Sequence, residues 1–249
     1  MEHARGKIIL VCAFITAASA AALDIAVGAY GGVGFPFAME TKIENPRFDD
    51  SYDVYEVPTD LFGVHPAAMI RYTMGLKGRW GVEASAGYHL LKQSEKFDAV
   101  FGFGSETHPL SVPASYLIPI TGGITFTPWG SRARVFGAAG GGLFIDKVGF
   151  KQVVMGWDYP SYTVGSVYIK SPGIYVGGGA SYPLGAWTFG VIPRIYCLFN
   201  TGEYIARNAD YHHRGSFQGN VIDEKTNVPV RKEFNDLIPV ALFGVAYNF

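Results

Sequence analysis

Eight stretches of the chain alternate apolar residues with polar or small residues at a period of two, as half-buried β-strands do. They cover about residues 23–35, 64–74, 79–90, 116–127, 132–146, 171–182, 187–199 and 236–249. In each stretch one row of alternate residues carries no charge, and every charged residue falls on the other row. That second row is rich in glycine and only sparsely charged, whereas the outer face of a soluble sandwich would carry many Lys and Glu residues. The pattern predicts a narrow barrel with lipid on its apolar face.

The connections between these stretches alternate in length. Three are short turns, at Leu76-Lys77-Gly78, Trp129-Gly130 and Leu184-Gly185, and four are long, at roughly 38–63, 92–113, 147–166 and 200–234. Outer-membrane barrels have short turns on the periplasmic side and long loops outside. We therefore predict an all-β fold: an eight-stranded antiparallel up-and-down transmembrane β-barrel with three short periplasmic turns and four long extracellular loops.

Aromatic residues gather on the apolar row near the short turns, as in the girdle that marks a membrane interface. They are Tyr72, Trp80, Phe126, Tyr182, Trp187, Tyr247 and Phe249. A lipocalin-like soluble barrel, the alternative, would not place its aromatic residues at one outer rim.

The N-terminal segment has the features of an export signal. Arg5 and Lys7 precede an apolar run over 8–17, which is too short to span a bilayer as a helix, and Ala18-Ser19-Ala20 offers a small-x-small cleavage site. We predict a cleaved signal peptide at 1–21 and one mature domain, the barrel, over 22–249. A retained anchor helix is the alternative.

Composition and charge narrow the function. Hydrophobic residues make up 49% of the chain and charged residues 16%, which excludes a disordered chain. The 20 Lys and Arg residues face 21 Asp and Glu residues, which excludes a nucleic-acid binder that relies on bulk positive charge. Outside the signal segment Cys197 is the single cysteine, so neither an internal disulfide nor a cysteine metal cluster is predicted. The chain has no motif for a cofactor.

The short turns predict which charged residues meet inside the barrel. If Gly75 lies opposite Arg79, then Arg71 faces Glu83 across the lumen side of two strands. Arg134 lies at a similar height, and we predict that these three residues form a polar plug in the half near the short turns, with gating as the alternative role.

Two further lumen pairs follow from the same reasoning. Tyr175 should face Arg194, and His65 should face His89. Two histidines could ligate a metal, but the spacing offers no third ligand, so no metal site is predicted.

The inward row near the long loops is apolar. It includes Leu117, Phe144, Ile169, Leu198, Ile238, Val240 and Leu242. Apolar side chains in a water-filled lumen would forgo about 25 cal/mol per Å² of burial, so they either fill the barrel or line a site for an apolar ligand. We predict an apolar vestibule, open to the outside and closed below by the polar plug.

Enzymatic chemistry is not predicted. His89 and Asp146 could approach each other, but no serine is placed to join them as a nucleophile. The third long loop carries Trp157, Tyr159 and Tyr162, a cluster that could bind a partner or cover the barrel mouth.

The C-terminal row of Phe243, Val245, Tyr247 and Phe249, together with the signal segment and strand spacing, resembles the small eight-stranded outer-membrane proteins. These include the OmpA transmembrane domain and the OmpX and OmpW families. The resemblance implies a bacterial outer-membrane location with cell-surface loops, and partners in outer-membrane lipid, lipopolysaccharide and the barrel-assembly machinery. We expect a monomer or small homo-oligomer.

Two functions follow from that resemblance. The first, similar to OmpW, is a narrow channel or receptor for small hydrophobic molecules. The second, similar to OmpX, is a surface adhesin that binds a host factor or lipopolysaccharide through its loops. A roomy apolar upper lumen would favour the first function, and a filled lumen would favour the second.

Overall fold

The structure, a computed structural model, describes residues 25–35, 41–44, 54–57, 65–75, 79–101, 106–130, 134–155, 160–214, 221–232 and 234–249. All regular elements in these ranges are β-strands. Within the same ranges, no helix has the length and apolar character needed to cross a bilayer. The predicted signal peptide at 1–21 lies outside the described residues.

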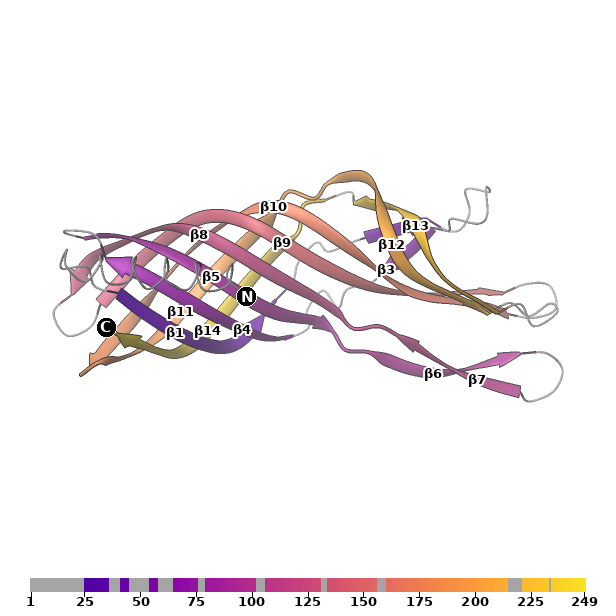
Figure 1. Ribbon diagram of the computed structural model, residues 1–249, viewed down its shortest axis with the longest axis horizontal. Coiled ribbons are helices and arrows are strands. Elements are labelled where there is room, and N and C mark those ends of the chain that lie inside the picture. Colours follow the sequence, from indigo (N-terminus) through magenta and orange to yellow (C-terminus); the bar gives the residue numbers. More distant parts are fainter. Residues whose placement is uncertain are drawn as a thin grey trace, which may run out of the picture.

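Eight strands form a closed antiparallel barrel (Figure 1). They are β1 (Ile25–Gly34), β4 (His65–Gly75), β5 (Trp80–Lys92), β8 (Ser115–Gly130), β9 (Arg134–Met155), β10 (Pro160–Leu184), β11 (Trp187–Leu198) and β14 (Leu237–Asn248). The pairings run β11-β14-β1-β4-β5-β8-β9-β10, and the pairing of β10 with β11 closes the ring. The predicted all-β, eight-stranded antiparallel barrel is therefore confirmed.

The alternating rows of the sequence become the two faces of the barrel wall. In β14, Ile238, Val240 and Leu242 are buried, while Phe243 on the other row is 62% exposed. The same alternation holds along the other barrel strands. Because successive side chains of a strand point to opposite faces, one row faces the lumen and the apolar row covers the outside.

Aromatic side chains on the outer wall lie at two heights, which form two bands. Near the short turns, the tilted rings of Trp80 and Phe126 have centroids 4.8 Å apart, and Trp187 meets Tyr247 edge to face at 5.0 Å. Ten positions up β8 from Phe126, Tyr116 lies 5.2 Å from the ring of Tyr88. Ten residues of a strand tilted by about 40° rise about 25 Å, which is the height of the apolar band of an outer-membrane barrel.

Six more strands lie at the opposite end from the short turns (Figure 1). They are β2 (Thr41–Glu44), β3 (Val54–Val57), β6 (Glu95–Phe101), β7 (Glu106–Val112), β12 (Gly202–Arg214) and β13 (Val221–Lys232). The outer part of β10 pairs with β12, and the sheet continues through β13 and β2 to β3. We call this extension, built on the outer parts of β9 and β10, the outer sheet.

The expected third loop, 147–166, is mostly strand, because β9 runs to Met155 and β10 begins at Pro160. Its inward residues Val148 and Phe150, with the adjacent Val167, are buried in a second core with apolar residues of β12 and β13. Burial of this row against neighbouring strands explains why β9 and β10 continue beyond the barrel.

Candidate functional site

An ion cluster fills the middle of the lumen. Arg71 Nε donates a hydrogen bond of 2.7 Å to Glu83 Oε2, and Arg194 Nη2 donates one of 2.6 Å to Glu83 Oε1. Tyr175 Oη donates a further bond of 2.6 Å to Oε1. The Arg194 and Glu83 side chains are 0% exposed and that of Arg71 is 9% exposed. Two buried guanidinium groups therefore share one carboxylate, which leaves an excess positive charge.

Small residues make room for this cluster. A Cβ at Gly123 would collide with Tyr175 Oη, and one at Gly140 would lie 2.7 Å from Tyr175 Cε1. Glycine at these two inward positions lets Tyr175 reach across the lumen to Glu83. On the other side of the cluster, Arg194 Nη1 donates a 3.0 Å hydrogen bond to Ser85 Oγ.

The strand register differs from the expected one by two residues at the β4–β5 hairpin. Arg71 lies opposite Ser85 and Thr73 opposite Glu83, so the predicted contact between Arg71 and Glu83 forms diagonally. The pairing of β4 with β5 begins at Gly75 and Gly81. The carbonyl of Arg79 accepts a hydrogen bond from the Thr127 amide of β8.

The register of the β10–β11 hairpin also differs from the predicted one by two residues. Tyr175 lies opposite Tyr196, and Arg194 lies opposite Gly177. The two turn residues are 185–186, because Leu184 pairs with Trp187 and Gly185 has φ of 63°. Tight hairpin turns need a positive φ at the first central position, which glycine adopts without strain. Glycine therefore belongs inside this turn rather than at its end.

Arg134 does not join the cluster as predicted. Arg194 takes the second position on Glu83, and Arg134 forms no ion pair with another described residue. The guanidinium of Arg194 also lies over the ring of Tyr175, 4.7 Å from its centroid. The sequence carried one signal for this role: apart from Asp24, at the start of the first alternating stretch, Glu83 is the single acidic residue on the inward rows of this half.

The half of the lumen near the outer sheet is filled by closely packed apolar side chains. Leu117, Phe144, Leu198, Ile238, Val240 and Leu242 are 0–3% exposed and belong to one core cluster. Tyr196 lies within it, with its ring centroid 5.5 Å from that of Phe144. Ile169 belongs to the second core, in the outer sheet. These seven residues thus lie in filled cores instead of the open vestibule that we expected.

The two lumen histidines are not opposed. His89 lies opposite Ala67, whereas His65 lies opposite Gly34. Both ring nitrogens of His89 are buried without a hydrogen-bond partner, and the ring edge contacts Tyr196. Within the described ranges, no three residues of the metal-ligating types come together.

A second buried ion cluster joins the barrel to the outer sheet, and sequence reasoning missed it. The Lys232 ammonium contacts the Asp236 carboxylate and lies 3.7 Å from Asp146 Oδ2. Asn200 Nδ2 donates a 2.5 Å hydrogen bond to Asp236 Oδ2. All four residues are buried. The cluster ties β9 to the ends of β11, β13 and β14 above the apolar core.

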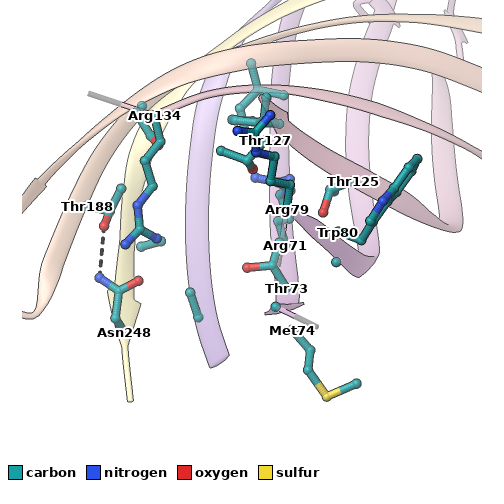
Figure 2. Close-up of a pocket in the computed structure, with 18 of the residues that line it drawn as sticks. Arg71, Thr73, Met74, Arg79, Trp80, Thr125, Thr127, Arg134, Thr188 and Asn248 are labelled. Carbon is teal, nitrogen blue, oxygen red and sulfur yellow. Dashed lines mark hydrogen bonds between the residues drawn. The ribbon is translucent and has the colours of Figure 1, made fainter. Parts of the chain in front are cut away.

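A cavity of about 440 Å³ occupies the lumen at the short-turn end (Figure 2). Arg71, Arg79 and Arg134 line it, together with hydroxyl and amide groups and some apolar groups. The polar groups include Thr73, Thr125, Thr127, Ser181, Thr188 and Asn248. The lower lumen, which we expected to be a closed polar plug, is therefore closed only at the level of Glu83.

The loop candidates are only partly described. Trp157 and Tyr159 lie outside the described residues. Tyr162, on β10, packs its ring against Phe97 of the β6–β7 hairpin at 5.9 Å between centroids. The Lys151 ammonium also contacts this hairpin, 3.7 Å from the centroid of Phe97.

Comparisons with known proteins find similarity in structure. No protein-family model matches the chain, and no curated protein matches it by sequence. A major outer membrane protein from Thermus thermophilus aligns at 12% identity and a TM-score of 0.48, over 92% of this chain and 100% of the other. Neisserial surface protein A aligns at 12% identity and a TM-score of 0.43, over 90% and 97%. The outer membrane protein AlkL aligns at 13% and 0.39, over 91% and 90%.

Proposed function

We propose that this protein is a non-enzymatic outer-membrane barrel that binds a partner at the cell surface through its outer sheet. The observation that carries the proposal is the filled upper lumen, topped by an ordered sheet with a core of its own. The proposed location in the outer membrane is supported by the apolar outer wall between the two aromatic bands, since such a surface is stable only in lipid.

The filled lumen argues against passage of a hydrophobic molecule. Leu117, Leu198 and Leu242 are fully buried among their neighbours, and the Lys232 cluster lies above them. A passage would require apolar side chains to separate and buried charges to lose their partners, at a cost of several kcal/mol. The channel function is therefore the less supported of the two expected functions.

The outer sheet provides a surface suited to binding. β12 and β13 pair along most of their length, and Val228 and Val230 of β13 are buried against the long β9–β10 hairpin. A preordered surface loses less conformational entropy on association than flexible loops do.

The proposal can be tested by comparing surface binding with permeation. Cells that display the intact barrel should adhere to epithelial monolayers or to immobilised lipopolysaccharide more than cells without it. A variant in which a two-residue turn replaces 207–225 loses all the β12 residues that pair with β10, so it disrupts the outer sheet and should lose this binding. Shortening the β6–β7 hairpin, which lies outside the outer sheet, is the matched control, and heat-modifiable migration on gels checks that each barrel has folded.

Permeation is measured as the uptake of an apolar fluorescent probe, 1-N-phenylnaphthylamine, by liposomes. We expect liposomes with and without the barrel to take up the probe at the same rate. Faster uptake that is unchanged by the hairpin deletion, combined with no adhesion, would show that the barrel is a hydrophobic channel.

A further inference from the structure

The cavity at the short-turn end has an unusual charge balance. Among the described residues, its lining includes three arginines and no aspartate or glutamate. Arg79 and Arg134 are exposed to the cavity, and within the same part of the chain neither has a recorded ion-pair partner. Figure 2 shows the Arg134 side chain extended toward Thr188 and Asn248. These positive groups are thus available to a ligand.

The ion cluster above the cavity adds to this charge. Glu83 is shared by Arg71, which reaches the cavity, and by Arg194, which lies fully buried behind it. Among the residues that the structure describes, one carboxylate therefore faces four arginines over the cavity and its inner wall. The apolar barrel wall has a low dielectric constant, which concentrates the field of these charges in the cavity.

We propose that this cavity binds a small anion with several negative charges, a phosphorylated or polycarboxylate compound that enters from the short-turn side. Arginine suits such a ligand because its planar guanidinium can donate two parallel hydrogen bonds to a phosphate or carboxylate. Hydroxyl groups of Thr73, Thr125 and Thr127 line the cavity beside the arginines and supply further donors. The volume of about 440 Å³ falls in the range of small-molecule sites.

The site is independent of surface binding, because the filled apolar core and the two ion clusters separate it from the outer sheet. Its position inside the barrel favours a free anion over a lipid headgroup, which would have to pass around the rim from the outer wall. A free anion and a lipid headgroup both carry a phosphate or carboxylate group that the arginines could bind. The experiment below therefore compares these two sources.

The test is isothermal titration of inorganic pyrophosphate, and separately of citrate, into the full barrel in nanodiscs of zwitterionic lipid. The double variant Arg79→Gln/Arg134→Gln removes two cavity charges and breaks no ion pair within the described part of the chain. We expect it to weaken pyrophosphate binding by about tenfold or more for each arginine, because hydrogen bonds to charged groups contribute at least that much. Arg231→Gln, which removes an exposed arginine of β13, is the matched control and should bind like the parent.

Saturable pyrophosphate binding that weakens in the double variant and with added salt supports the site. No heat of binding in the parent barrel, or equal weakening by Arg231→Gln, overturns it. If the double variant does not fold, the two single variants give the same comparison. Repeating the titration in nanodiscs with phosphatidylglycerol identifies the source: unchanged binding supports a free anion, and loss of binding shows that headgroups occupy the cavity and overturns the free-anion proposal.

Discussion

Replacing Glu83 with glutamine should destabilise the barrel more than removing either arginine that it binds. Glu83→Gln keeps the shape of the side chain but removes the charge that compensates Arg71 and Arg194. Removing one partner of a buried ion pair costs about 3–5 kcal/mol, because the other charge stays buried and unpaired. Arg194 should account for most of this cost, since its side chain is 0% exposed and that of Arg71 is 9% exposed toward the cavity.

The arginine variants should behave differently. Arg71→Gln leaves Glu83 paired with Arg194, and Arg194→Gln leaves it paired with Arg71, so each variant retains a neutral pair. We expect each to lower the free energy of unfolding by less than Glu83→Gln does. Ser85→Ala removes the hydrogen bond of 3.0 Å from Arg194 and the bond of 2.8 Å with the Thr121 hydroxyl, and it should cost about 2 kcal/mol.

The assay is urea unfolding of the barrel in detergent micelles, monitored by tryptophan fluorescence. All variants are fitted with one common slope of the unfolding free energy against urea concentration. The order of the four variants matters more than any single value. If Glu83→Gln has an unchanged midpoint, or is more stable than Arg194→Gln, the two arginines are not held by this carboxylate and the argument from buried charge is wrong.

Three further variants test other parts of the lumen. Leu242→Ala should lower the free energy of unfolding by about 2–5 kcal/mol, because removing this fully buried side chain leaves a cavity; the same urea titration measures it. Lys232→Met should cost about 3–5 kcal/mol by leaving the Asp236 carboxylate buried and unpaired, and a midpoint equal to the parent's would contradict that role. Gly123→Val should displace both the Tyr175 ring and the neighbouring β9 backbone, since a Cβ there would collide with the Tyr175 hydroxyl and with the Ala139 carbonyl oxygen; a crystal structure in which neither has moved would contradict the role of Gly123.

The sequence determined the barrel because its rows of alternate residues record which face each side chain takes. Along β14, Phe243 and Tyr247 face outward while Leu242 faces the lumen, as the period of two requires. The lengths of the connections then placed the short turns at one end. Both kinds of information are local, so they can be read from consecutive residues.

The tertiary structure decided which inward residues meet. A shift of two residues in a hairpin preserves every inward and outward position, so the alternation cannot detect it. The position of Gly185 inside its turn sets the register of the β10–β11 hairpin. Diagonal and cross-lumen contacts, such as that of Arg194 with Glu83, depend on this register and on the closure of the ring. Whether the upper lumen is open or filled depends on how side chains from all eight strands fit together, which only the closed barrel decides.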